Sequence, residues 1–215
     1  MADILNKTPV RCIGVLVIFG LLFLPVALPM RVLMLAAVAL LWTYLAAGNL
    51  TSIGLSRHPL VPTVAWAAGI AITVLAFGHF IQPVLNRSLG SDIDLSGYGA
   101  LAGNAEVALR LLGMALTSAA FGEEILFRGF LLHQLTAVLG SGARARWAAI
   151  VAGAVLFGFA HAMQGPVGMV TTGLVACLFG WAWFRSGRNL WAMILAHALI
   201  DSFGISMLYL GWTGM

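Results

Sequence analysis

Long apolar runs, separated by short segments rich in polar residues, glycine and proline, dominate the sequence. A helix that crosses a bilayer needs about 20 consecutive, mostly apolar residues. Seven runs have about this length or more, namely 12–29, 32–48, 62–85, 105–138, 146–163, 167–185 and 190–210, and the fourth of them is longer than one crossing requires. The pattern therefore predicts an all-α fold, a polytopic transmembrane helical bundle of about seven spans.

The composition supports this interpretation. Hydrophobic residues make up 61% of the chain and charged residues only 8%, whereas soluble domains carry roughly 25% charged residues. No hydrophilic stretch is long enough to fold by itself. We therefore expect one membrane domain, in which residues 1–104 supply three spans and residues 105–210 form a core of four spans.

The charges in the predicted loops differ between the two sides of the membrane. One side receives most of the basic residues, namely Lys7, Arg11, Arg57, Arg144, Arg146, Arg185 and Arg188. The other side receives Arg31 and Arg87, the latter close to Asp92 and Asp94. Cytoplasmic loops carry an excess of Lys and Arg, so the N-terminus is predicted to be cytoplasmic in a cell membrane. The net charge of +4 thus reflects membrane orientation and not binding of nucleic acid.

Six of the ionisable residues inside the predicted spans are candidates for a functional site. They are Glu123, Glu124, Arg128, His161, His197 and Asp201. An ionisable group at the bilayer centre costs about 2.5–3.5 kcal/mol on insertion scales. Several such groups without partners would cost on the order of 10 kcal/mol, comparable to the stability of a typical protein. The six residues must therefore pair, line a wet cavity, or both, either as a structural network between helices or as a functional site.

The spacing along residues 105–138 places the two glutamates on different faces of the predicted helix. At about 100° per residue in an α-helix, one stripe contains Glu106, Arg110, Thr117, Glu124 and Arg128. Glu124 precedes Arg128 by four residues, the favourable order for an acid–base pair on one helix face. Glu123 points about 100° away and has no cation on its own helix, which makes it a candidate general base.

Two histidines lie on later spans. His197 and Asp201 are four residues apart on the last span, so the carboxylate can hold the imidazole in one orientation. His161 lies just before Gly165 and Pro166, where its helix is expected to end. Counting at about 1.5 Å per residue puts Glu123 and His161 beyond the middle of the membrane, but His197 only about 10 Å in, so the two estimates disagree.

Together these residues resemble a known family. Glu123, Glu124 and Arg128 fit an EExxxR motif, Phe157 and His161 fit FxxxH, and His197 and Asp201 fit HxxxN/D. In this order on successive helices, over about residues 105–205, they resemble the CPBP family of intramembrane proteases. That family includes the CAAX prenyl proteases of the Rce1 type and bacteriocin-immunity relatives. Residues 53–55, Ile-Gly-Leu, resemble a further segment common in the family.

The resemblance implies a role for each residue. Glu123 and His161 would activate a water molecule for attack on the scissile carbonyl, and Glu124 and Arg128 would position the site or the substrate. The last motif would stabilise the oxyanion. An ionised Asp201 cannot donate a hydrogen bond, so we expect Asp201 to orient His197 or to be protonated. The implied substrate is a membrane-associated protein or peptide, and nothing in the sequence indicates recognition of a prenyl group.

Other functions and a metal stay open at this point. Two histidines and the carboxylates could bind zinc with one open position for water, and the family is often described as metalloproteases. The chain has no HExxH motif, and a glutamate-activated water explains the same residues, so we favour the mechanism without a metal. The alternatives to a protease are a proton-coupled transporter that uses the Glu/His/Asp groups as a relay, and a non-catalytic immunity or scaffold protein.

Overall fold

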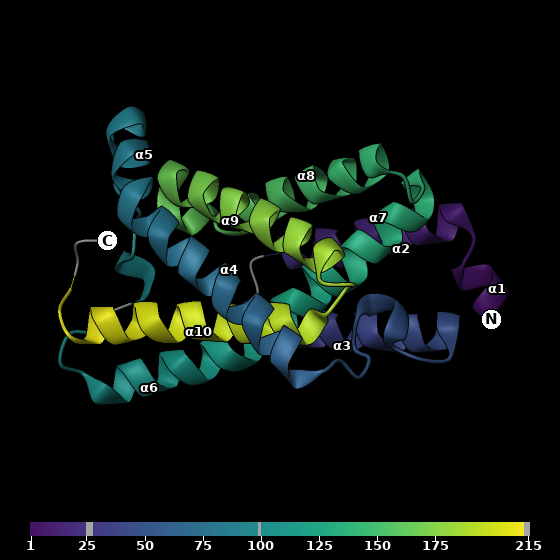
Figure 1. Ribbon diagram of the computed structural model, residues 1–215, viewed down its shortest axis with the longest axis horizontal. Helices are drawn as coiled ribbons and strands as arrows, with labels where there is room; N and C mark the ends of the chain where they lie inside the picture. Colours follow the sequence, from purple (N-terminus) through teal and green to yellow (C-terminus); the bar gives the residue numbers. More distant parts are fainter. Residues whose placement is uncertain (25–27, 99, 213–215) are drawn as a thin grey trace.

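A computed structural model describes residues 1–24, 28–98 and 100–212. Six helices in these ranges are long and apolar enough to cross a membrane, and they are Pro29–Ala47, Leu60–Phe80, Ala105–Leu139, Ala143–Ala160, Ala162–Arg185 and Leu190–Tyr209. A shorter apolar helix, Thr8–Leu22, accompanies them, and no strand occurs in the described ranges. The predicted all-α bundle of about seven spans is confirmed. Figure 1 shows that most helices run along the long axis, with the two termini at opposite ends.

The N-terminal helices begin earlier than predicted. After the short α1 (Ala2–Leu5), α2 spans Thr8–Leu22 and α3 spans Leu28–Ala47, whereas the expected spans were 12–29 and 32–48. A proline in the first turn of α2 explains its early start, because proline favours the first helical position. With 15 residues, α2 is only about 22 Å long, shorter than the hydrocarbon core of about 30 Å. Residues 25–27 lie outside the described residues.

The third predicted span, 62–85, is two helices. After the short turn η1 (Thr51–Ile53), α4 spans Leu60–Phe80, and α5 spans Gln82–Leu89. The break occurs at Ile81 because Pro83 lacks a backbone N–H and its ring would clash with the carbonyl four residues earlier. Figure 1 shows that α5 leaves the direction of α4. The segment after α5 contains the short turn η2 (Ser96–Tyr98).

The helix that carries both glutamates lies in the centre of the bundle. It is continuous through α6 (Ala105–Met114), η3 (Ala115–Leu131) and α7 (Leu132–Leu139). The 17 residues of η3 form a π-helix, in which each backbone hydrogen bond spans five residues instead of four and which is frequent at functional sites. Its main neighbours are α3 and α10. A Cβ at Gly122 would lie 2.8 Å from Val32 Cγ1, so this glycine lets α3 approach η3 beside the glutamates.

The last helices form a close antiparallel pair and a final span. They are α8 (Ala143–Ala160), the turn η4 (Ala162–Gln164), α9 (Gly165–Arg185) and α10 (Leu190–Tyr209). A Cβ at Gly158 would lie 2.6 Å from the Met169 carbonyl oxygen, so a small residue is needed where α8 and α9 meet. His161 caps the end of α8, two residues before the predicted end at 163.

Several hydrogen bonds join the N-terminal part of the chain to the C-terminal part, and two of them involve Arg11 and Gly54. Arg11 Nη1 donates to Oε1 of buried Gln134 at 2.5 Å. The Leu190 N–H, at the start of α10, donates to the Gly54 carbonyl at 3.2 Å. Gly54 has a φ of +91°, and a Cβ there would collide with the Arg188 carbonyl oxygen. The glycine of the Ile-Gly-Leu segment is thus explained by this close approach of two loops.

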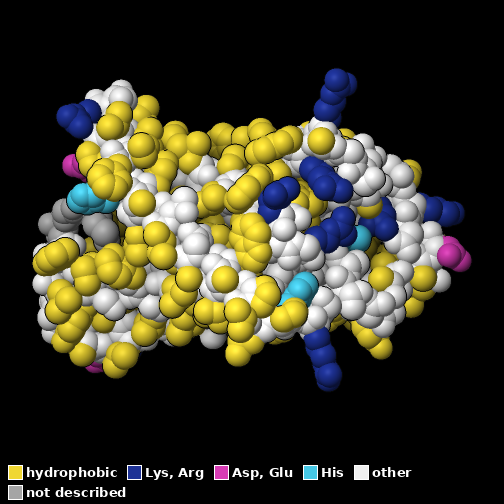
Figure 2. Space-filling model, viewed as in Figure 1, with side chains coloured by type: hydrophobic (Ala, Val, Ile, Leu, Met, Phe, Trp, Pro, Cys, Tyr) yellow, Lys and Arg dark blue, Asp and Glu magenta, His cyan; other side chains and the backbone are white. Residues whose placement is uncertain are grey.

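Charge is distributed unevenly over the surface. Figure 2 shows Lys and Arg side chains gathered over the half of the visible face that holds the N-terminus, while hydrophobic side chains cover most of the rest. This separation is what a multi-pass membrane protein requires. Which end faces the cytoplasm stays a prediction.

Candidate active site

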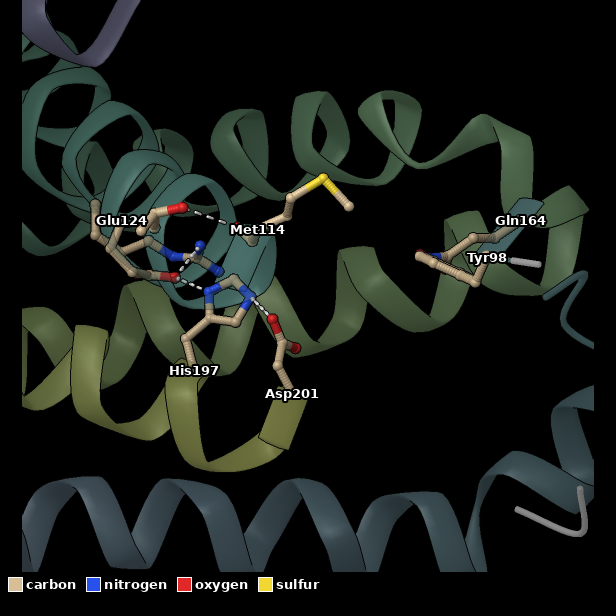
Figure 3. Close-up of polar contacts among 8 residues, drawn as sticks. Tyr98, Met114, Glu124, Gln164, His197 and Asp201 are labelled. Carbon is tan, nitrogen blue, oxygen red and sulfur yellow. Dashed lines mark hydrogen bonds and ion pairs between the residues drawn. The ribbon is translucent and has the colours of Figure 1, made fainter. Parts of the chain in front are cut away.

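Glu124 is the centre of a buried polar network. Its side chain is 0% exposed, and its Oε1 accepts hydrogen bonds from Arg128 Nη1 and from His197 Nδ1, both at 2.8 Å. The predicted pairing of Glu124 with Arg128 is confirmed. The contact with His197 was not predicted, and it joins η3 to α10 inside the bundle (Figure 3).

Two aromatic rings enclose the Arg128 guanidinium. The guanidinium carbon lies 4.6 Å from the ring centre of Phe157, on α8, and 4.7 Å from that of Phe179, on α9. A cation over the face of an aromatic ring within about 6 Å is attracted by the ring, and more strongly when both are desolvated. Arg128 is only 3% exposed. The phenylalanine of the FxxxH motif therefore helps to hold the arginine of the EExxxR motif.

His197 is held more closely by Glu124 than by Asp201. Because a carboxylate only accepts hydrogen bonds unless it is protonated, the 2.8 Å contact puts a hydrogen on His197 Nδ1. Nε2 of the same ring lies 3.5 Å from Asp201 Oδ2, longer than the 2.7–2.9 Å of a charge-assisted hydrogen bond. The imidazole is thus fixed through Nδ1, and its Nε2 edge, beside Asp201, is the one available for another partner.

Glu123 and His161 remain outside this network. Oε2 of Glu123 is buried and has no hydrogen-bond partner among the residues that the structure describes. His161 Nδ1 donates to the Phe157 carbonyl oxygen at 2.8 Å, which leaves Nε2 as the nitrogen that can accept a proton or a hydrogen bond. Within the described ranges, no hydrogen bond or ion pair joins Glu123 to His161.

The π-helix corrects two predictions. Glu106 and Arg110 form an exposed ion pair, whereas Glu124 and Arg128 are buried, so the predicted polar stripe is not one continuous face. A π-helix has more residues per turn and rises less per residue than an α-helix, so the angles and depths counted for an α-helix do not apply to η3. The estimated difference in membrane depth between the glutamates and His197 was therefore wrong. Glu124 and His197 are in contact.

The segment that carries these residues matches a known protein family. The family model for type II CAAX prenyl endopeptidases, Rce1-like, matches residues 104–203. This segment belongs to the CAAX protease family. Neither a curated protein nor a solved structure matches the chain significantly. All six predicted site residues lie within the CAAX protease segment, and six apolar helices place the chain among multi-pass membrane proteins.

One polar pair beside the CAAX protease segment was missed by the sequence analysis. Gln164 Nε2 donates to the Tyr98 hydroxyl at 2.6 Å. Tyr98 lies in η2, outside the matched residues and outside any apolar run. The only signal in the sequence is that Gln164 follows His161 by three residues.

The side chains of this site do not fit a zinc ion as they are arranged. Both nitrogens of His197 face carboxylates, and Nδ1 of His161 is bound to a backbone carbonyl. Among the described residues, no three His, Cys, Asp or Glu side chains converge in a way that could hold a metal.

Proposed function

We propose that this CAAX protease is an intramembrane endopeptidase that hydrolyses a peptide bond of a membrane-associated protein or peptide. The water molecule would be activated by Glu123 and His161. One observation carries the proposal: Oε2 of Glu123 is buried without a hydrogen-bond partner in the described part of the chain. Glu124 Oε2 also lacks a partner there, but Glu124 Oε1 accepts hydrogen bonds from Arg128 and His197. Glu123 is thus the glutamate that no cation or imidazole among the described residues holds. Buried polar atoms are normally satisfied, and exceptions often mark a functional role.

The proposed reaction uses the Glu123 carboxylate as a general base. Glu123 takes a proton from the water while the water oxygen attacks the scissile carbonyl carbon. His161 Nε2 accepts the second hydrogen bond of the same water and so orients it. The tetrahedral intermediate then collapses, the C–N bond breaks, and protonated Glu123 returns the proton to the leaving nitrogen. The immediate products are a carboxylic acid and an amine, and the acid then gives its proton to the amine, which leaves a carboxylate and an ammonium group. The site regains its starting state.

Precursor accumulation in cells tests this function. We expect at least one membrane-associated protein or peptide to accumulate uncleaved when Glu123 is replaced by alanine. Quantitative membrane proteomics of cells with wild-type protein or Glu123→Ala, at equal levels of the two proteins in the membrane, gives the measurement. If every product of processing forms equally in both strains, the chain is not a protease that uses this site.

The network around His197 leads to a second prediction. We propose that His197 carries a hydrogen on both nitrogens, with Nδ1–H donated to Glu124, that its Nε2–H donates to the oxyanion, and that Asp201 orients or charges this ring. Asparagine keeps the shape of Asp201 and can still contact the ring, so Asp201→Asn should keep at least about a tenth of the wild-type rate. The His197→Ala variant should be slower than wild type by about 10²–10³-fold, as for removal of an oxyanion donor. Cleavage of the accumulated precursor by purified variants measures both rates. Equal and complete losses would contradict this division of roles.

A further inference from the structure

The described residues between α5 and α6, 90–98 and 100–104, are attached to the end of the site that carries His161. We call these residues the strap. The Asp94 N–H donates to the Gln164 carbonyl at 3.0 Å, and the Gly103 N–H donates to the Tyr209 carbonyl, at the end of α10, at 2.9 Å. The strap is thereby fixed to η4, which follows His161, and to the end of α10, the helix that carries Asp201.

Within the strap, Tyr98 points its hydroxyl towards the turn after His161. The Tyr98 oxygen accepts a hydrogen bond from Gln164 Nε2 at 2.6 Å, so the phenolic hydrogen is free to be donated elsewhere. The Gln164 N–H in turn donates to the His161 carbonyl at 2.9 Å. Figure 3 shows the Tyr98–Gln164 pair apart from Glu124 and His197, with Asp201 on the side nearer to the pair.

The charges around Tyr98 keep its hydroxyl protonated. Burial raises the pKa of the Tyr98 phenol, and the negative charges of Asp201 and Glu123 raise it further, against the opposite effect of the Gln164 hydrogen bond. Tyr98 is therefore a neutral donor beside the acidic groups of the site.

A substrate segment in this site needs hydrogen-bond donors. Backbone carbonyls of an extended peptide that are removed from water must be satisfied by the protein. Within the network, Arg128 Nη1 and His197 Nδ1 already bind Glu124, and the Nε2 edge of His197 is assigned above to the oxyanion. The Tyr98 hydroxyl is a donor at the edge of the site whose hydrogen makes no bond to the protein atoms that the structure describes.

We propose that Tyr98 is a substrate-positioning residue, whose hydroxyl donates a hydrogen bond to a backbone carbonyl of a peptide segment bound between the strap and Glu123. This inference rests on the proposed endopeptidase function. It extends the substrate site beyond the family-matched residues 104–203, to the strap that precedes them. It also gives Gln164 a role, because its amide sets the direction in which the phenolic hydrogen points.

Tyr98→Phe tests the proposal, because it removes one oxygen atom and keeps the ring. One hydrogen bond contributes about 0.5–1.5 kcal/mol, so KM should rise roughly 3–10-fold while kcat stays within about twofold, the signature of lost uniform binding. The assay uses a synthetic quenched-fluorescent peptide that spans the cleavage site of the accumulated precursor. Tyr44→Phe, which changes an exposed tyrosine on α3, is the matched control and should equal the wild type.

Each outcome separates the substrate role from the alternatives. An unchanged KM for Tyr98→Phe, with Glu123→Gln inactive, overturns the role of Tyr98 and leaves the protease site intact. A lower melting temperature together with a lower kcat at unchanged KM shows that Tyr98 only anchors the strap, and also overturns the proposal. Full activity of Glu123→Gln overturns the proposed function itself.

Discussion

Replacing Glu123 by glutamine is expected to slow peptide-bond hydrolysis by about 10²–10⁴-fold, the usual contribution of a general base, and to leave the fold intact. Glutamine has nearly the same shape but cannot take a proton from water. Glu123 makes no ion pair within the described residues, and its Oε2 has no partner there, so the substitution breaks no structural contact. The measurement is kcat/KM of purified protein, alongside its melting temperature in detergent.

Glu106→Gln is the matched control for this result. Glu106 lies on the same continuous helix, but it is exposed and paired with Arg110 at 3.1 Å, so its rate should stay within about twofold of wild type. A Glu123→Gln protein that keeps more than a third of the wild-type rate would exclude Glu123 as the base. Treatment of the wild type with a chelator completes the assay, and we expect the rate to persist because the proposed chemistry uses protein groups alone.

Replacing Arg128 by methionine is expected to have the largest effect on stability. Methionine fills a similar volume, but Glu124 is then buried at 0% exposure with only His197 as a partner. Removal of one member of a buried ion pair typically costs about 3–5 kcal/mol, because the other charge stays buried. The contacts of the guanidinium with Phe157 and Phe179 are lost as well. Little protein should accumulate in the membrane, with a melting temperature far below wild type.

A double variant tests whether the unpaired buried charge of Glu124 causes the loss of stability. Glu124→Gln together with Arg128→Met removes both charges and should recover much of the lost stability, though not the activity. Arg110→Met, at the exposed pair on α6, should melt like the wild type, because exposed pairs contribute only about 0–1 kcal/mol. If Arg128→Met melts at the wild-type temperature, Arg128 is not needed to stabilise the buried Glu124.

The parts of the site that were predictable depend on spacing along one helix. Glu124 and Arg128 are four residues apart, and this spacing alone brings their side chains together. The three motifs likewise placed all six candidate residues in the segment that the family model matches. Short-range geometry and residue order are properties that a single sequence contains.

The contacts between helices were not predictable in the same way. The hydrogen bond between Glu124 and His197 joins residues that are 73 positions apart, and it depends on how far α10 is displaced along η3. No residue pattern in the sequence predicts the π-helix, although the π-helix changes which side chains share a helix face. Tyr98 lies in a segment without periodicity, so only the folded chain shows that it reaches the turn after His161.

Hydrogen bonds join residues before position 104 to residues after it. The family-matched segment, residues 104–203, is therefore only part of the folding unit. If the chain were cut before residue 104, lipid tails could cover the bare apolar faces at little cost, because lipid is as apolar as the helices. They could not replace the Arg11 guanidinium on Gln134 or the Gly54 carbonyl that binds the Leu190 N–H. A shortened protein for crystallisation or display should therefore retain the segments around both residues, although neither carries a motif of the site.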